Sequence, residues 1–370
     1  MSTGSWLGPI AVHRLNNFDL IRLLAAVQVF FMHSVVWLKL PISPMVAEVV
    51  DWFPGVPVFF MISGVLVTHS FVRLPTLRQY LRHRALRIFP ALWVCLAISF
   101  LLAAWQGNLT HSSLFLQTVI WAVMQGSFFQ FVNFYVNPGV TNGVLWSIAT
   151  ELQFYIVLPL LISGGSHLFK GKARISVALI ALAAASSAFH AWNLSHQAQL
   201  LPKLFPIFYA SVLANGYLFI FGALAYLWQD RLHHWCQDKF LIFLAIYLIV
   251  RSTLFATGIP AYQLHSSMLG MLVYPLLGLV IYSFAFSFQG LSQRILKGND
   301  FSYGIYIYHM PVIYALIHLK IEGASGLALA TIAVASLAAL SWLFIERPAL
   351  SLKREEHSPA TRHTWIGARR

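Results

Sequence analysis

Long apolar runs separated by short polar loops dominate this sequence. Ten of them approach the roughly 20 residues that a helix needs to cross a bilayer. They are 18–38, 55–72, 84–104, 144–163, 174–192, 210–228, 240–257, 267–287, 302–319 and 326–345. A further apolar run, 113–132, is interrupted by three glutamines and a glycine. The pattern predicts an all-α integral membrane protein with about ten transmembrane helices.

The basic loops orient this predicted bundle. The loop after 55–72 is rich in arginine, and the loop before 174–192 holds Lys170 and Lys172, so the positive-inside rule places both loops in the cytoplasm. Three full crossings between them would put them on opposite sides, so we predict that 113–132 is a re-entrant or interfacial segment. Both termini then lie in the cytoplasm. Four of the 24 basic residues remain outside, namely Lys39, Lys203, Arg251 and Lys320.

Composition narrows the class of protein. The chain is 59% hydrophobic and 9% charged, whereas a soluble domain carries about 25% charged residues. A net charge of +13 would favour nucleic-acid binding in a soluble protein. Here the basic residues lie between apolar runs, so topology explains them and no nucleic-acid partner is expected. We predict a cytoplasmic segment 1–17, a membrane domain 18–348 and a basic cytoplasmic tail 349–370.

Ionisable residues inside the predicted spans are the first candidates for function, because a charge in a bilayer is costly. Arg22 and His33 are eleven positions apart. That spacing returns a helix to within roughly 20° of the same face and separates the two by on the order of 16 Å. The pair predicts a polar path with a charge at its inner end and a titratable base deeper in. The alternative is a histidine that only bonds a backbone carbonyl between packed helices.

Two more groups stand out. Glu151 lies at a predicted depth similar to that of His33, and a carboxylate beside an imidazole fixes its tautomer and raises its basicity. We therefore expect these two side chains to meet. Arg84 and Arg87 are three residues apart, hence on one helix face, and guanidinium groups bind phosphate well. The alternative is that these arginines only anchor the helix end to lipid phosphates.

Six short motifs, in order, resemble those of the acyltransferase-3 integral membrane proteins. The resemblance covers about residues 15 to 350, and two positions depart from the family pattern. Pro57 and Leu152 stand where the family usually has acidic residues. The chain resembles the stand-alone branch, which lacks an extracytoplasmic hydrolase-like domain. The motifs are 18–22 with 32–34, 55–64, 84–90, 146–155, 302–309 and 344–348.

The resemblance implies a multi-pass enzyme of the bacterial inner membrane. It would move an acyl group, typically acetyl, from cytoplasmic acyl-coenzyme A to a hydroxyl of an extracytoplasmic carbohydrate or glycolipid, without a metal. The pantetheine arm is of the same order as the rise from Arg22 to His33. The expected catalytic residues are His33, Glu151 and Arg22. The expected donor-binding residues are Arg84, Arg87, Arg22, Tyr308 and His309. The expected acceptor-binding residues are Trp146, Ser147 and Asp19.

Two other classes of protein stay open at this point. A transporter or flippase of a saccharide or lipid intermediate would share the spans and the buried charges, and so would a non-catalytic membrane sensor. Consumption of acyl-coenzyme A distinguishes the enzyme from both.

Overall fold

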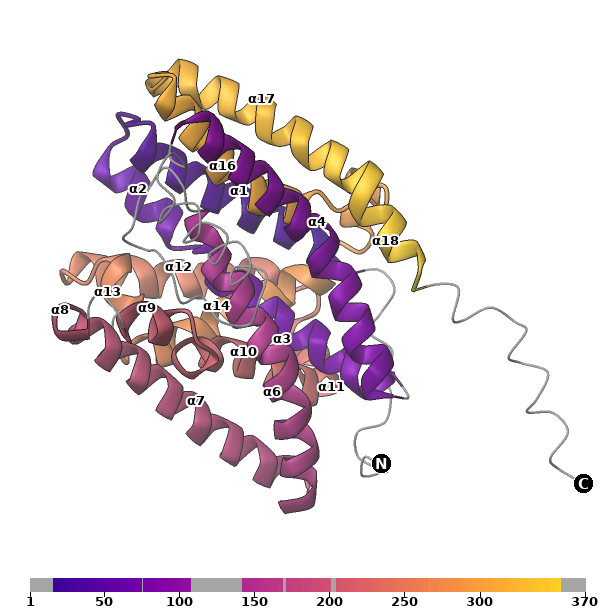
Figure 1. Ribbon diagram of the computed structural model, residues 1–370. Helices are drawn as coiled ribbons and strands as arrows, with labels where there is room; N and C mark the ends of the chain where they lie inside the picture. The colour runs from indigo at the N-terminus through magenta and orange to yellow at the C-terminus, as the bar shows by residue number, and fades with distance from the viewer. Residues whose placement is uncertain are drawn as a thin grey trace, which may run out of the picture.

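The computed structural model describes residues 16–74, 76–107, 142–168, 171–200, 204–265 and 267–353. Within these ranges every regular element is a helix (Figure 1). The long helices are α1 (Phe18–Trp37), α3 (Gly55–Arg73), α4 (Leu77–Trp105), α6 (Trp146–Leu168), α7 (Lys172–Ser195), α10 (Val212–Leu227), α12 (Phe240–Ala256), α14 (Gly270–Phe286), α16 (Ser302–His318) and α17 (Gly323–Ser341). The short ones are α2 (Pro44–Asp51), η1 (Gly143–Leu145), α8 (Gln197–Leu200), α9 (Leu204–Tyr209), α11 (Gln229–Cys236), α13 (Ala261–His265), α15 (Leu291–Leu296), the π-turn η2 (Trp342–Glu346) and α18 (Arg347–Ser351).

Among the described residues, seven helical stretches are long and apolar enough to cross a membrane, and there are eight if α11 and α12, bent by 90° from each other, form one span. The predicted membrane-type helical architecture is therefore confirmed for the described part of the chain. The predicted spans 267–287 and 302–319 correspond to α14 and α16, which have only 17 residues each. The count of ten and the orientation stay predictions. The predicted re-entrant segment 113–132 lies outside the described residues.

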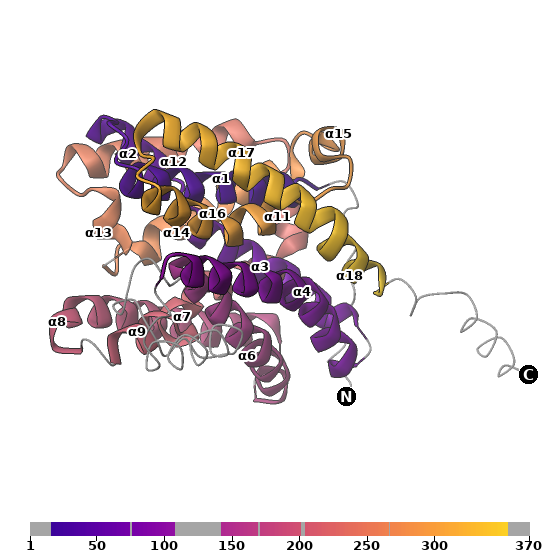
Figure 2. The same ribbon diagram turned by 45° about the horizontal axis from the view of Figure 1, so that its top comes forward.

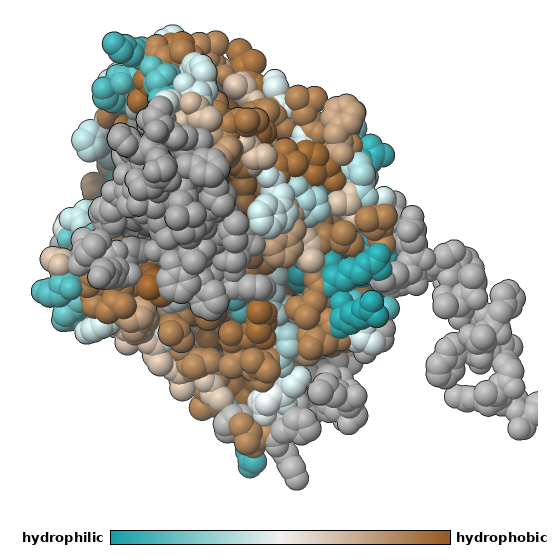
Figure 3. All heavy atoms as spheres, in the orientation of Figure 1, coloured by the Kyte–Doolittle hydropathy of each residue, from teal (hydrophilic) through white to brown (hydrophobic). Residues whose placement is uncertain are grey.

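The surface agrees with a lipid environment. In Figure 3, apolar side chains cover much of the visible flank, and hydrophilic ones gather towards its margins. Large apolar residues such as Leu160 and Ile249 are 68% and 65% exposed. Exposed apolar surface of this extent is unusual on a soluble protein and normal on a helix that faces lipid tails.

A tight contact between α3 and α10 lies in the core of the bundle. A Cβ atom at Gly64 would stand 2.1 Å from the carbonyl oxygen of Phe219, and one at Gly222 would stand 2.1 Å from that of Met61. Small residues at such interfaces let two backbones approach closely. Neither glycine can be replaced without moving one helix against the other.

Helix α1 is the element that connects the two ends of the candidate site. It packs against α3 and α16, and Figures 1 and 2 show α17 along the outside of α16, with α6 and α7 on the opposite side of the bundle. Asn17, fully buried, fixes the start of α1. Its amide donates to the carbonyl of Ser287 at 2.8 Å, and its side-chain oxygen accepts from the backbone N–H of Ser292 at 2.9 Å.

Candidate active site

A charged cavity of about 570 Å³ lies between the start of α1, the ends of α3 and α18, and the first turns of α4. We call it the basic cavity. Positively charged side chains outnumber carboxylates in its wall. Its ionisable lining residues are Asp19, Arg22, His69, Arg73, His83, Arg84, Arg87, Asp300 and Lys353.

Asp300 organises one side of the basic cavity. Its carboxylate accepts from Arg87 at 2.5 Å and from Arg22 at 3.4 Å. Its other oxygen accepts from the backbone N–H of Ser302, the first residue of α16, at 3.1 Å. Burial alone would raise the pKa of Asp300, but Arg87 and Arg22 outweigh burial and hold that pKa well below its usual range. Arg22 and Arg87 therefore stand already neutralised in part.

Arg84 is held differently. Its guanidinium donates to the hydroxyl of Ser70 at 3.3 Å and lies 5.7 Å from the ring centroid of Tyr155, and its Nε has no hydrogen-bond partner. Lys353 lies at the same cavity. Burial, together with the charges of Arg84, Arg87 and Arg22, lowers its pKa to about 7. A cavity with this surplus of positive charge suits a phosphorylated anion.

A narrow space, which we call the neck, follows the basic cavity towards the interior. Its volume is about 40 Å³, and it shares Arg22 and Arg87 with the basic cavity. At its other end it shares Val56, Phe60 and Tyr306 with a third cavity. Because each cavity shares lining residues with the next, the three cavities lie end to end.

Glu151 lies in the neck. Its carboxylate accepts from the hydroxyl of Ser63 on α3 and from that of Tyr155 one turn further along α6, both at 2.6 Å. The predicted pair between Glu151 and His33 does not form. The two residues were predicted to lie at a similar depth in the membrane. However, the side chain of Glu151 faces α3, while the partner of His33 comes from α16.

The third cavity, which we call the outer cavity, has a volume of about 460 Å³ and contains His33 in its wall. Trp146 lines it too, with its ring centroid 4.8 Å from that of Tyr209. The structure thus brings Trp146 and His33 to one cavity, as the predicted roles require. Other groups capable of hydrogen bonding also line it, namely Gln28, Asp51, His190, Asn215, Tyr217 and Tyr262.

His33 contacts a second histidine. Its Nδ1 lies 2.9 Å from Nε2 of His309, and Nδ1 of His309 lies 3.2 Å from the carbonyl oxygen of Ile305. A carbonyl oxygen only accepts, so in the neutral pair Nδ1 of His309 carries its proton and Nε2 accepts from Nδ1–H of His33. That assignment leaves the lone pair of His33 on Nε2. An imidazole fixed in this tautomer can act as a general base.

We expected His309 and Tyr308 to bind the donor. His309 meets His33 in the interior and does not line the basic cavity. Tyr308 is buried, with its hydroxyl 3.4 Å from that of Ser341, and it does not line that cavity either. Neither residue lies in the wall of the basic cavity, because the face of α16 that carries them packs against α1 and α17, and their contact with the donor stays a prediction.

We expected Asp19 and Ser147 to bind the acceptor, and the structure places both away from the wall of the outer cavity. Asp19 lies in the basic cavity, 3.3 Å from Arg22, at the opposite end of α1 from His33. Its acceptor role stays a prediction. Ser147 lies at the neck, where its hydroxyl is 2.6 Å from that of Tyr306.

Sequence reasoning gave no role to Asp300 or Tyr306. An aspartate two residues before a predicted helix is a helix-start signal, so Asp300 could have been identified as a cap. Its pairing with arginines from α1 and α4 has no local signal. In the described ranges, no group of three His, Cys, Asp or Glu residues is placed to hold a metal ion.

Comparison with known proteins gives one family and several relatives. A family described as an acyltransferase domain matches residues 15–346. Nodulation protein 10 of Rhizobium leguminosarum bv. viciae is 33% identical over 358 residues, which cover 92% of this chain and 94% of that protein. An O-acetyl transferase of Shigella phage Sf6 is 25% identical over 344 residues, covering 91% and 96%.

A third relative is longer than this chain. The putative peptidoglycan O-acetyltransferase YrhL of Bacillus subtilis is 27% identical over 329 residues, which cover 80% of this chain and 50% of that protein. No solved structure matches the chain significantly.

Proposed function

Because the chain belongs to the acyltransferase-3 family, and is thus an acyltransferase, we propose that it moves an acetyl group from cytoplasmic acyl-coenzyme A to a hydroxyl of an extracytoplasmic carbohydrate. Two relatives carry names of O-acetyl transferases. The observation that carries the proposal is the series of three cavities, with surplus positive charge at one end and the lone pair of His33 at the other.

The donor enters from the basic cavity. Arg84, Arg73 and Lys353 bind the phosphates of coenzyme A, since none of these cations is among those that pair with Asp300. The pantetheine arm extends through the neck, past Glu151 and Tyr306, and presents the thioester to the outer cavity. The neck, at about 40 Å³, must widen for the arm and acyl group to pass, and the bulkier nucleotide stays in the basic cavity.

The acceptor hydroxyl binds in the outer cavity beside His33. Nε2 of His33 removes the hydroxyl proton while the oxygen attacks the thioester carbonyl carbon. The tetrahedral intermediate then collapses, the carbon–sulfur bond breaks, and the proton on His33 passes to the departing thiolate. The products are an O-acyl ester and free coenzyme A, and His33 returns to its starting state.

His309 acts through His33. By accepting from Nδ1–H it holds the basic Nε2 of His33 towards the cavity and stabilises the imidazolium that forms in the transition state. Glu151 fixes the hydroxyls of Ser63 and Tyr155 at the neck, where the arm passes.

Topology completes the proposal. Ten crossings of the bacterial inner membrane, with segment 1–17 and tail 349–370 in the cytoplasm, place the basic cavity on the cytoplasmic side and the outer cavity towards the extracytoplasmic side.

The test is acyl transfer by the purified protein in proteoliposomes. Acetyl-coenzyme A labelled in its acetyl group is supplied on the side of the basic cavity, with a candidate saccharide on the other. We expect label in an ester on the saccharide and release of free coenzyme A. Movement of saccharide across the bilayer with no use of acetyl-coenzyme A would support a transporter instead. Mass spectrometry of cell-surface glycans with and without the gene identifies the acceptor.

A further inference from the structure

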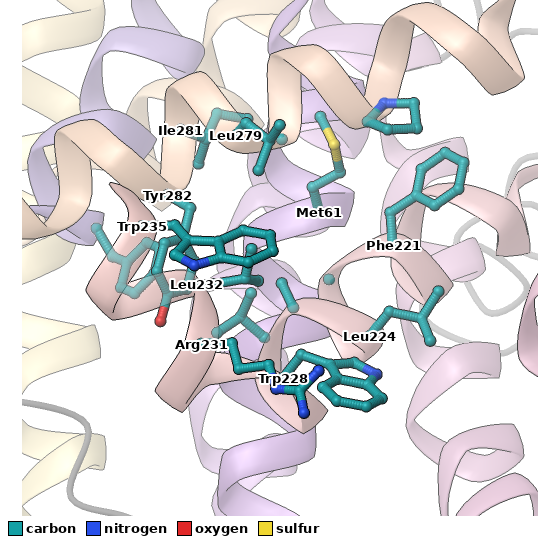
Figure 4. A pocket seen from close by; sticks show the side chains of 16 residues that line it. Met61, Phe221, Leu224, Trp228, Arg231, Leu232, Trp235, Leu279, Ile281 and Tyr282 are labelled. Atoms are coloured by element: carbon teal, nitrogen blue, oxygen red, sulfur yellow. The ribbon is translucent and has the colours of Figure 1, made fainter. Parts of the chain in front are cut away.

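A fourth cavity, separate from the three above, opens between α3, α10, α11 and α14 (Figure 4). Its volume is about 470 Å³, and we call it the apolar groove. Figure 4 shows its side chains arranged around the space, with Arg231 beside Trp228 at one margin. Its wall is almost entirely hydrocarbon, including Met61, Phe221, Leu224 and Leu279.

The short helix α11 forms the margin of the apolar groove. The residues that it and its cap contribute, Trp228, Arg231, Leu232 and Trp235, are spaced by three, one and three positions, which puts them on one helix face. The axis of α11 is bent by 90° from that of α12, the candidate span that follows. A short amphipathic helix with tryptophans, lying across the end of a span, is typical of the membrane interface.

Of the described residues that form the wall of the apolar groove, Arg231 alone is charged. Its guanidinium carbon lies 4.8 Å from the ring centroid of Trp228, and no carboxylate of the described residues forms an ion pair with it. Neighbouring polar atoms are already bonded. The indole N–H of Trp228 donates to the hydroxyl of Ser176 at 2.9 Å, and the hydroxyl of Tyr282 donates to the carbonyl of Gln229 at 3.3 Å. The margin therefore offers one uncompensated cation.

The size of the apolar groove fits part of one lipid tail. Helix α14 lines it from Pro275 to Tyr282, a rise on the order of 10 Å at about 1.5 Å per residue. Half of the hydrocarbon core of a bilayer is roughly 15 Å thick. Phe18, in the first turn of α1, also lies in the wall, so the groove and the basic cavity lie at the same end of the bundle.

We propose that the apolar groove binds an anionic phospholipid of the inner leaflet. One acyl chain fills the space between α10 and α14, and the phosphate sits on Arg231. Charge complementarity selects an anionic head group, and the hydrocarbon wall selects a tail over a free anion. This site goes beyond acyl transfer, because none of its contacts reaches His33 or the thioester path. Bound lipid holds α11 against α14.

Two substitutions separate the head group from the tail. Arg231→Gln removes the charge. Gly278→Leu fills the groove, because a Cβ atom there meets only the sulfur of Met61, at an ordinary 3.5 Å. Two matched controls exist. Arg294→Gln removes a charge at an exposed position of α15, and Gly164→Leu adds the same bulk on α6, where a Cβ atom meets nothing within 4 Å.

The experiment uses the full chain, delipidated in detergent and titrated with phosphatidylglycerol or phosphatidylcholine. Native mass spectrometry counts bound lipid, and thermal unfolding gives Tm. We expect one phosphatidylglycerol to bind before any phosphatidylcholine and to raise Tm. Arg231→Gln should weaken phosphatidylglycerol binding about tenfold, the loss of one charge-assisted contact. Gly278→Leu should reduce binding of both lipids, and both controls should behave as wild type.

Three results would overturn the proposal. They are an unchanged preference for phosphatidylglycerol in Arg231→Gln, full lipid binding in folded Gly278→Leu, and an equal rise in Tm with inorganic phosphate alone, which would indicate a plain anion site. Should Gly278→Leu fail to fold, phosphatidylglycerol with a diazirine in its acyl chain replaces it. Its crosslinks should map to α10, α11 or α14 in the wild type, and crosslinks confined to other helices would exclude the site.

Discussion

The basic cavity and the outer cavity lie towards opposite ends of α1 and differ in how their ionisable groups are partnered. In the basic cavity a buried carboxylate, Asp300, holds two arginines, and further cations remain around it. In the outer cavity the imidazole of His33 meets a second imidazole instead of an acid. The first arrangement suits a charged ligand. The second suits proton transfer, because it leaves one imidazole lone pair without a proton. Under the proposed function, donor binding and chemistry take place towards different ends of one helix.

The largest effect is expected from His33→Ala. Loss of the general base should lower turnover by about 10²- to 10⁴-fold, while affinity for acetyl-coenzyme A stays close to wild type because the phosphates bind at the other end. Initial rates with labelled donor, and equilibrium binding of coenzyme A, check the two halves. If His33→Ala lost donor binding together with turnover, the proposal that the two cavities serve separate functions would be contradicted.

Within the basic cavity, Arg84→Ala and Arg87→Ala should differ. Arg84→Ala should weaken coenzyme A binding by about 1.5–3 kcal/mol, the usual value for a hydrogen bond to a charged group, with little change in Tm. Arg87→Ala should lower Tm as well, because it leaves the carboxylate of Asp300 buried with a weaker partner. Calorimetry and thermal unfolding measure both. Arg78→Ala, on an exposed part of α4, is the control, and equal behaviour of the two variants would contradict the distinction.

Substitutions of His309 test whether it positions His33. His309→Leu removes the acceptor for Nδ1–H and should lower kcat about tenfold, the value of one hydrogen bond, with KM for donor unchanged. His309→Gln offers a carbonyl oxygen near the position of Nε2 and should restore most of the rate. A purely structural role predicts equal losses for both variants and a matching fall in Tm, which thermal unfolding would detect.

The smallest effect concerns Lys353. Its pKa is lowered to about 7 by burial and by the nearby arginines, so the free protein loses this charge as pH rises through 7. A bound phosphate favours the protonated form, so coenzyme A affinity should fall several-fold between pH 6 and pH 8. Lys353→Gln should flatten that part of the profile. The other lining groups and the ligand phosphates are the same in both proteins, so the difference between the two profiles isolates Lys353.

The fold was largely readable because apolar runs determine helices in a membrane. The predicted runs 18–38 and 240–257 correspond to α1 and α12 within two residues. The helices α2 and α11 were missed, since at eight residues each they show no period long enough to recognise. Their amphipathic faces can be recognised only once the neighbouring helices that they cover are known.

The sequence predicted the positions of site residues along their helices, but not which neighbouring helix each side chain faces. The spacing of Arg22 and His33 correctly separated a charged end from a second cavity, because rise along a helix follows from residue count. The expected partner of His33 was wrong, because depth does not tell which neighbour a helix face meets. The contact with His309 joins two helices far apart in the chain, and no local pattern encodes it.

The paired glycines between α3 and α10 affect how a mutational scan of this protein should be interpreted. Neither Gly64 nor Gly222 can accept even a methyl group without displacing a backbone. Their α3 neighbours Ser63 and Val65 face the neck and the apolar groove, so a shift of α3 would disturb both at once. Intolerance at these two positions would then look like that of catalytic residues, although they touch no reactant. Abundance of folded protein, scored beside activity, separates the two causes.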